Sequence, residues 1–390
     1  MTIVDSDVRT IGLLTAQHHV PLPHLSYAEL EALLRAADLT GRGGAGFPTA
    51  RKLAGVRSAA GRRQRPVVVG NAMEGEFLSH KDAVLLRDNP DLVLDGLQVL
   101  GGALDAKRRI LAVGPDIDSA PVEQAAIRRG GFEVQPLDGG FVAGQESALV
   151  NRLNGGPGVP TDPVLPVWRR GVDGRPTMVS NAETLAQIGL LARYGADWFR
   201  SRGTPEDPGT FLATVSGSSQ SVVSSPGVVE VPRGIALREL LTLAGTDLRR
   251  VQAVLVGGYH GTWVTDLDVR LSRPHLAAYG ASPGAGVVHV LDRGHCPLIV
   301  SAHVVDYLAG QSARQCGPCV NGLPRMADAL SALAEMKAGP QVRGDIERLR
   351  ALVVGRGACA HPDGTARLVS STMTVFADHV NAHLAGVCPR

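Results

Sequence analysis

The chain has 390 residues, of which 44% are hydrophobic and 19% are charged, and its formal net charge is +2. This length allows two to four domains, and the composition is that of an ordinary globular protein rather than a disordered one. The balanced charge argues against a nucleic-acid surface, and apolar runs such as residues 188–192 are too short to span a membrane. The start of the chain lacks a secretory signal pattern, so we expect a cytoplasmic protein without direct membrane insertion.

The first half of the chain alternates helical and strand-like patterns. In chain order, these patterns predict helices at residues 26–38 and 49–60, a buried strand at 66–71, a helix at 89–101, a strand at 109–114, a helix at 121–129 and a strand at 132–135. Alternation at this pace is typical of a parallel sheet with helices on both faces. The sequence therefore predicts an α/β, Rossmann-like domain.

The pattern changes at a Gly- and Pro-rich linker, residues 203–209. After it, the sequence predicts strands at 210–217 and 227–231, a helix at 237–244, a strand at 253–258, and then helices at 322–337, 342–353 and 365–384. The strands and the first helix suit a small ubiquitin-like α+β (β-grasp) domain. We predict four parts: an N-terminal helical segment with a Gly-rich loop (1–51), the Rossmann-like domain (52–202), the ubiquitin-like domain (203–295) and a C-terminal helical bundle (296–390).

A glycine-rich run, residues 41–48, lies between the first two predicted helices. Four glycines in six positions leave one side of the backbone without Cβ atoms, so a flat or phosphorylated ligand can approach the amides closely. The amides also precede a helix N-terminus, which favours phosphate. A tight connection between two helices is the alternative interpretation.

Three further loops each follow or precede a predicted element: residues 71–76, 141–149 and 179–185. The first follows a strand directly, and ligands of open α/β sheets bind at the carboxyl ends of strands. Its acids can accept hydrogen bonds from ribose hydroxyls, although a solvated polar turn is the alternative. The other two are also compatible with simple capped helix starts. Four such loops in one α/β half are more typical of the walls of one pocket.

The five cysteines are an odd number in a chain without a visible signal peptide, so we expect no disulfide framework. Cys316 and Cys319 form a C-x-x-C pair before a helix, and Cys359 follows forty residues later. This spacing suits an iron–sulfur cluster or zinc, for which His361 is the nearest fourth ligand. A thioredoxin-like disulfide is disfavoured because the pair does not follow a strand. Cys296 is interpreted as a small buried side chain.

In combination, these motifs resemble the NADH-binding, FMN-carrying flavoprotein subunit of respiratory complex I. They also resemble the matching subunits of NAD-reducing hydrogenases and NAD-dependent formate dehydrogenases. The resemblance covers nearly the whole chain and is carried by residues 41–52, 71–76, 140–149, 176–185, the ubiquitin-like segment and the cysteine-bearing helical end. It implies FMN, NAD(H) and an iron–sulfur cluster, with hydride transfer from NADH to FMN and single electrons passing to the cluster.

The resemblance also implies roles for particular residues. It implies that FMN is held by Gly41, Gly43, Gly44, Lys52, Asn71, Asn181 and Thr184, and the same loops add Arg42, Glu74 and Gly144 as candidate cofactor-binding residues. The dinucleotide would lie over the flavin near Gly44, positioned by Phe47, Glu76 and Glu146 as the candidate catalytic residues. Hydride transfer needs two flat rings in contact, and a glycine-lined wall with an aromatic side chain permits this.

The chain departs from the family at the predicted cluster. The family uses C-x-x-C-x-x-C and a distant fourth cysteine; Cys316, Cys319 and Cys359 match the last three ligands, but Ala313 stands at the first. Three cysteines suit a three-iron (3Fe–4S) cluster, or a 4Fe–4S cluster with a fourth ligand from His361, Cys388 or solvent. Absence of the cluster is the remaining alternative.

Further departures lie near the flavin and nucleotide. Relative to the family, Met73 replaces an Asp, Phe141 a Tyr, Ser180 the first of two Asn, Gln145 the first of two Glu, and Gly55 an aromatic residue. Most of these changes remove a polar contact or a negative charge. Fewer carboxylates near the adenosine ribose would repel a 2′-phosphate less, so NADPH is an alternative to NADH.

The sequence predicts an FMN-dependent NAD(P)H dehydrogenase that passes electrons to a ferredoxin-like partner protein or a quinone reductase complex. The altered cluster motif suggests a stand-alone paralogue. A subunit of the Rnf type is disfavoured because it would carry eight cysteines. A non-catalytic ligand- or partner-binding protein that has lost the cluster is the alternative from another class, favoured by Ala313, Met73 and Gly55.

Overall fold

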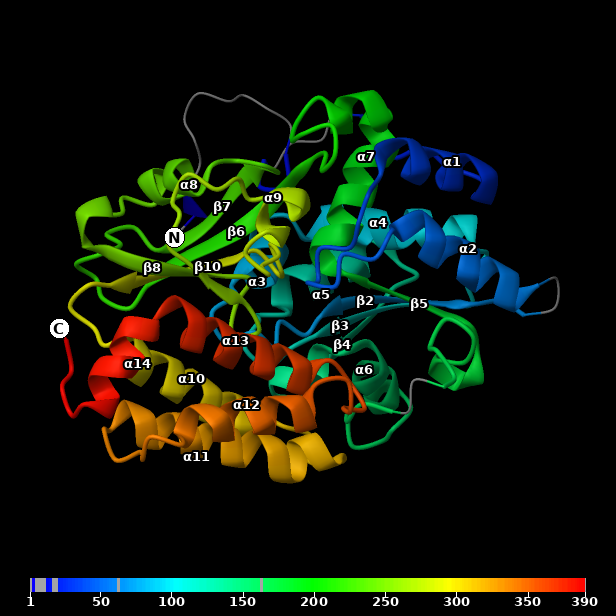
Figure 1. Ribbon diagram of the computed structural model, residues 1–390. Helices are drawn as coiled ribbons and strands as arrows, with labels where there is room; N and C mark the ends of the chain where they lie inside the picture. Colours follow the sequence, from blue (N-terminus) through cyan, green and yellow to red (C-terminus); the bar gives the residue numbers. More distant parts are fainter. Residues whose placement is uncertain (1, 4–11, 16–19, 62–63, 162–163, 390) are drawn as a thin grey trace.

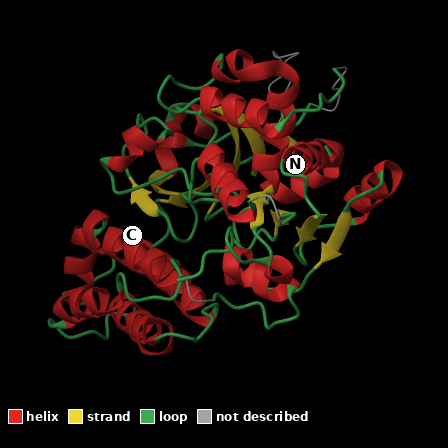
Figure 2. Ribbon diagram, turned by 90° about the vertical axis from the view of Figure 1, so that its right-hand side faces the viewer, coloured by secondary structure: helices red, strands yellow, loops and turns green. Residues whose placement is uncertain are grey.

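A computed structural model describes residues 2–3, 12–15, 20–61, 64–161 and 164–389 (Figure 1). Residues 4–11 and 16–19 of the predicted N-terminal segment lie outside the described residues. Within the described part, a four-stranded sheet and a six-stranded sheet are accompanied by a group of C-terminal helices. In the turned view of Figure 2, these helices gather near the C-terminus, to one side of the strands.

The first half of the chain forms the predicted parallel sheet with covering helices. Its elements are α1 (Tyr27–Ala37), α2 (Thr49–Ala60), β2 (Val67–Ala72), α3 (Lys81–Asp88), α4 (Pro90–Ala103), β3 (Arg108–Val113), α5 (Ala120–Arg129), β4 (Glu133–Pro136), α6 (Glu146–Leu153), β5 (Thr177–Asn181) and α7 (Ala182–Arg200). The strand order is β4-β3-β2-β5, and every neighbouring pair is parallel. The sequence did not predict α3.

Both faces of this sheet are buried, which explains the unbroken apolar run of β2. Val68 packs into a core shared with α4 and α7, whereas Val67 and Val69 pack into a second core with α6. Gly96 lets α4 approach α7 closely, because a Cβ there would lie 1.9 Å from the carbonyl oxygen of Leu185. The helices therefore fix the sheet from both sides, as the alternating pattern predicted.

The six-stranded sheet follows the linker. Its elements are β6 (Thr210–Gly217), β7 (Gly227–Pro232), α8 (Leu237–Leu243), β8 (Val251–Val256), β9 (Thr262–Val264), α9 (Arg273–Ala277) and β10 (Val287–Asp292), and β1 (Thr2–Ile3) joins its edge. The order is β1-β7-β6-β10-β8-β9, with β6 and β10 parallel in the middle. The strand predicted at 253–258 ends at Val256, because Gly257 and Gly258 adopt positive φ angles of 98° and 82° and turn the chain out of the sheet.

The C-terminal helices are α10 (Pro297–Gly310), α11 (Leu323–Ala334), α12 (Val342–Val353), α13 (His361–Val375) and α14 (Ala377–Leu384). The single helix predicted at 365–384 is wrong: it is divided at Phe376, whose ring packs 5.5 Å from Trp263, centroid to centroid. Burial of this ring outweighs the local preference for a continuous helix. None of the helices in the described ranges is long and apolar enough to cross a bilayer.

Candidate active site

The glycine-rich loop is closed at its base. Thr40 and Pro48 form a β-bridge, and the Gly41 amide donates to the Phe47 carbonyl at 2.9 Å. Gly44 and Gly46 adopt positive φ angles of 103° and 59°, which favour glycine. The amides of residues 43–46 have no acceptor among the residues that the structure describes. A closed loop with free amides is the kind of backbone cradle that binds an anionic or ring oxygen.

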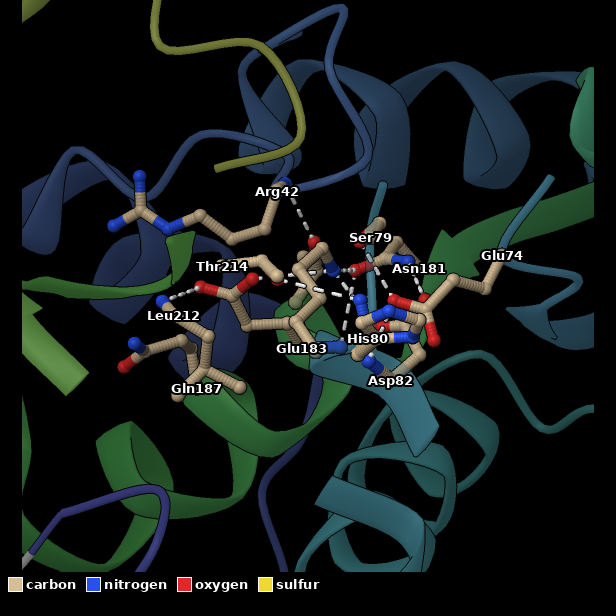
Figure 3. A network of polar contacts seen from close by, with 12 residues as sticks. Arg42, Glu74, Ser79, His80, Asp82, Asn181, Glu183, Gln187, Leu212 and Thr214 are labelled. Atoms are coloured by element: carbon tan, nitrogen blue, oxygen red, sulfur yellow. Dashed lines mark hydrogen bonds and ion pairs between the residues drawn. The ribbon is translucent and has the colours of Figure 1, made fainter. Parts of the chain in front are cut away.

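Two asparagines join the loops at the ends of β2 and β5. The Asn71 side-chain amide donates to the Gly144 carbonyl at 2.8 Å, and the Asn181 amide donates to the Asn71 carbonyl at 3.3 Å. The Asn181 side-chain oxygen also caps α7 by accepting from the Glu183 amide at 3.0 Å (Figure 3). Residues 71–76, 141–149 and 179–185 therefore meet at one edge of the sheet, as predicted.

The glycine-rich loop is tied to the same place. The Arg42 amide donates to the Thr184 hydroxyl at 2.8 Å, and a Cβ at Gly43 would lie only 3.3 Å from the Asn181 Cβ. From the following helix, the Lys52 ammonium donates at 2.8 Å both to the Val179 carbonyl and to the Glu146 carboxylate. All four predicted loops converge, and their remaining free amides suit the FMN that the resemblance implies.

A buried charged network supports this meeting point. Lys81, whose side chain is 2% exposed, lies 2.7 Å from an Asp82 oxygen and 3.2 Å from a Glu183 oxygen. It also donates to the Asn181 side-chain oxygen at 2.9 Å. Burial alone would lower the pKa of Lys81, but the neighbouring carboxylates raise it above its usual value. The network holds Asn181 in one orientation. Sequence patterns gave no signal for Lys81 or Asp82, and they placed Glu183 only within the predicted loop 179–185.

Glu74 belongs to the supporting structure rather than to the loop edge. Its carboxylate accepts from the Ser79 hydroxyl at 2.7 Å and from the Asp82 and Ala83 amides at 2.9 Å, so it caps the first turn of α3 (Figure 3). Burial, followed by the Asp82 charge, raises the pKa of Glu74. Its position fixes α3, and with it Lys81, beneath the loops.

Arg42 contributes to the loop cluster through its backbone amide, which donates to Thr184. Its side chain is buried, points away from Asn181 and Glu74 in Figure 3, and donates to the Pro208 carbonyl at 3.4 Å. Burial, followed by the Arg233 charge, lowers the pKa of Arg42 to about 9. The guanidinium therefore links the glycine-rich loop to the linker that precedes β6, and the contribution of Arg42 to the loop cluster is its amide.

The candidate nucleotide residues lie at the rim of the cluster. The Phe47 side chain is 48% exposed, with the Arg51 guanidinium 5.5 Å from the ring centroid, so one flat face is available for stacking. Glu76 is half-buried, accepts from the Tyr259 amide at 3.0 Å, and has its pKa raised to about 7 by burial. Glu146 is paired with Lys52. These contacts are consistent with their predicted roles, which remain predictions.

Two of the residues that depart from the family pattern, Gln145 and Gly55, have structural partners here. The Gln145 side-chain oxygen caps α6, accepting from the Ser147 and Ala148 amides at 2.8 and 2.9 Å. A Cβ at Gly55 would lie 3.5 Å from the Trp168 ring, so an aromatic side chain from another segment covers this glycine. At both positions, contacts within the protein therefore support the structure around the site.

The three candidate cluster cysteines are brought together by the helical region. Cys316 precedes a π-helical turn (Pro318–Gly322) that contains Cys319, and Cys359 precedes α13. Burial, then the neighbouring Cys316 thiol, raises the pKa of Cys319 to about 12. Burial opposes ionisation of Cys316 too, but the amides of Ala358 and Cys319 lower its pKa. Amide donors aimed at sulfur are typical of iron–sulfur sites, so these thiols fit a cluster.

Two of the three predicted sources of a fourth ligand are engaged elsewhere. His361 Nε2 is 2.8 Å from the Leu308 carbonyl, and its Nδ1 is 3.1 Å from His260. Cys388 lies with Cys296 and His383 instead of with the cluster cysteines. The alternatives that agree with the structure are therefore a solvent ligand or a three-iron cluster, which needs no fourth ligand.

Two family models match the chain and define its class. The Nuo51 FMN-binding domain matches residues 34–190, which contain all four loops. The NADH-ubiquinone oxidoreductase-F iron-sulfur binding region matches residues 300–383, which contain Cys316, Cys319 and Cys359. The chain thus has an FMN-binding domain and an iron–sulfur binding region, and the predicted FMN and iron–sulfur cofactors are confirmed.

The chain is 30% identical over 383 residues to the F 2 subunit of NADH-quinone oxidoreductase of Rhizobium meliloti (strain 1021), covering 91% of this chain and 89% of that protein. It is 31% identical to HndC, a subunit of the NADP-reducing hydrogenase of Solidesulfovibrio fructosivorans, covering 92% of this chain and 76% of that protein. It therefore belongs to the family of the F subunits of NADH-quinone oxidoreductase.

A solved structure confirms the mixed α/β architecture. The crystal structure of NAD+-reducing [NiFe]-hydrogenase in the air-oxidized state superposes with a TM-score of 0.81 at 30% identity. The match covers 92% of this chain, which spans 63% of that hydrogenase chain.

Proposed function

We propose that this protein is an FMN-dependent NADH dehydrogenase that passes electrons through an iron–sulfur cluster to a partner redox protein. The observation that carries this proposal is the convergence of four loops, joined by hydrogen bonds, at the carboxyl ends of β2 and β5. Bound FMN supplies the exchange between two-electron hydride chemistry and single-electron transfer. The family membership and the matched iron–sulfur region support the same assignment.

Different residues of the loop cluster would have different roles in binding FMN. The free amides of Gly43 and Gly44 and the side-chain amide of Asn71, which has a second hydrogen, offer neutral donors to the flavin. The side-chain groups of Asn181 are bonded within the protein, so this residue would contribute by holding the loops in place. Lys52 adds a positive charge at the same edge, which favours any negative charge that develops there. Gly41, Thr184 and Gly144 shape the wall through backbone and hydroxyl contacts.

The rim residues would position the nicotinamide nucleotide. The exposed ring of Phe47 offers a stacking surface, and the carboxyl groups of Glu76 and Glu146 can accept hydrogen bonds from its amide or ribose hydroxyls. Loops held in place by helices and sheet keep this geometry from changing, which favours ring-to-ring contact.

We also propose the finer domain assignment. Residues 203–295 would form a ubiquitin-like domain around the core that α8 shares with the six-stranded sheet, and residues 296–390 would form the iron–sulfur domain. Residues 1–51 and 52–202 would together supply the flavin site. Because its relatives are named as subunits of larger oxidoreductases and hydrogenases, a ferredoxin-like or other redox protein is the proposed electron acceptor.

Anaerobic reduction tests this function. The chain, loaded with FMN, iron and sulfide, should lose its flavin absorbance when NADH is added and recover it when ferredoxin is added. A parallel titration with NADPH determines which nucleotide is preferred. Protein that retains FMN but shows no bleaching with either nucleotide would contradict the proposal and favour a binding protein without catalysis.

A further inference from the structure

A second group of sulfur and nitrogen donors lies in the helical region. Among the described residues, Cys296, His383 and Cys388 each offer a ligand atom, and these atoms lie within 4.8 Å of one another. Cys296 immediately precedes α10, His383 belongs to α14, and Cys388 follows α14 near the end of the chain. The group therefore joins three separate segments, and it includes none of the candidate cluster cysteines.

The spacing of these donors suits one small metal ion. Cys296 Sγ lies 3.4 Å from His383 Nε2. In a tetrahedral zinc site, bonds of about 2.3 Å to sulfur and about 2.0 Å to nitrogen place these two atoms about 3.5 Å apart. The observed separation agrees with this value, so an ion can enter without displacing either side chain. Both cysteines are free thiols in the structure.

The histidine is already oriented as a ligand. His383 is 2% exposed, and its Nδ1 lies 3.2 Å from the Leu333 carbonyl, the distance of a hydrogen bond in which Nδ1–H is the donor. A metal-bound histidine usually donates its second ring nitrogen to such an acceptor, which fixes the tautomer. The Nε2 lone pair is then directed toward Cys296. This is the arrangement that supports a metal ion in characterised sites.

The segment that carries Cys388 is held close by a neighbouring residue. His379 lies one turn before His383 on α14, and its ring contacts the Pro389 backbone and, at 3.2 Å, the side-chain amide of Gln252. The third donor is therefore positioned by contacts that do not depend on the ion.

We propose that Cys296, His383 and Cys388 bind a zinc ion that fastens the end of the chain to the start of α10. Two thiolates and one imidazole are a typical zinc donor set, and the thiolates neutralise the charge of the ion. Each thiol releases its proton to solvent on binding. Three protein ligands leave a fourth tetrahedral position for a water molecule. The proposal does not depend on the flavin or on the proposed dehydrogenase activity.

Metal analysis of the full-length chain tests this site. After equilibration with zinc and removal of the excess, a competing chelator measures zinc affinity in the wild type, in Cys388→Ser and in Cys359→Ser. Cys359→Ser is the matched control, because it makes the same chemical change at a candidate cluster ligand. We expect Cys388→Ser to weaken zinc binding more than tenfold and Cys359→Ser to retain this zinc.

A second measurement keeps the test independent of folding defects. Cobalt substituted for zinc should give thiolate charge-transfer absorption in the wild type that is lost in Cys388→Ser, while both proteins retain the same FMN content. Zinc should also raise the melting temperature of the wild type and leave that of Cys388→Ser unchanged. Equal zinc affinity in the two proteins, or intact-mass evidence that Cys296 and Cys388 form a disulfide in the purified chain, would overturn the proposal.

Discussion

The loop cluster and the C-terminal thiols are both assembled from distant segments, but they are held together differently. In the loop cluster, hydrogen bonds between loops and the buried Lys81 network form a framework from protein atoms alone. At the helical end, the cysteines are free thiols, and the Cys296, His383 and Cys388 donor atoms lie close together without a disulfide. The difference indicates that the flavin site is preformed, whereas the sulfur sites are completed by the metal that they bind.

The largest expected effect is the loss of the buried cation from the framework. In Lys81→Met, the Asp82 and Glu183 carboxylates would remain buried without their partner, so the free energy of unfolding should fall by about 3–5 kcal/mol. Urea unfolding measures this change. Lys107→Met, at an exposed position, is the matched control and should change stability by less than about 0.5 kcal/mol. Equal stability of the two variants would show that the network does not hold the loops.

Next in size is the loss of iron from the predicted cluster. Cys319→Ser removes a buried thiol next to Cys316, so its iron content after reconstitution should fall more than tenfold while FMN content is unchanged. Cys388→Ser should keep its iron, because Cys388 lies with Cys296 and His383. Iron and flavin quantitation on the two variants separates the two sulfur groups. If Cys388→Ser lost the iron instead, Cys388 would belong to the cluster and not to a separate group with Cys296 and His383.

A smaller effect, on FMN affinity, is expected where the glycine-rich loop approaches the loop that contains Asn181. The Cβ of Gly43→Ala would lie 3.3 Å from the Asn181 Cβ, so FMN affinity should fall by about tenfold, or about 1.4 kcal/mol. Gly344→Ala in α12, where a Cβ meets no atom within 4 Å, should leave FMN affinity unchanged. Flavin fluorescence titration of both variants makes the comparison. An unchanged affinity in Gly43→Ala would place the ligand elsewhere.

The smallest expected effect is a pH dependence of stability that arises from Glu76, at the rim of the loop cluster. Burial raises the pKa of Glu76 to about 7, so the folded protein holds this proton more tightly than the unfolded chain. The resulting stabilisation is complete below the unfolded pKa of about 4.5 and is lost as the pH rises through about 7. Glu76→Gln cannot ionise and should gain about 1 kcal/mol over the wild type above pH 7, since the side chain is only half-buried.

Melting curves at acidic and alkaline pH measure this difference. Glu206→Gln, at an exposed position in the linker, serves as the control and should follow the wild type at every pH. A Glu76→Gln variant that also follows the wild type would show that the carboxyl group is solvated.

The sheet and the loop positions could be predicted because they depend on local patterns. Strand β6 and helices α2 and α12 occupy the predicted residues, and the loops had to converge because parallel strands bring their carboxyl ends to one edge. The division at Phe376 could not be predicted, because it results from packing against Trp263 rather than from the helical sequence.

Polar contacts between residues far apart in the sequence could also not be predicted from sequence patterns. Sequence patterns did not indicate Lys81, because its pairing with Glu183 links residues about one hundred positions apart. Cys296 was expected to be buried, as it is, yet its contact with His383 across 87 positions follows no metal-binding spacing. Such contacts arise from how whole elements pack, and they appear only in the folded chain.

The most direct test of the account is a titration of the chain, freed of flavin, with FMN. The account predicts that one FMN binds per chain, with quenching of flavin fluorescence, and that Gly43→Ala weakens this binding while Gly344→Ala does not. A folded chain that binds no FMN, or that binds it equally well in all three proteins, would contradict the assignment of the four loops as the flavin site.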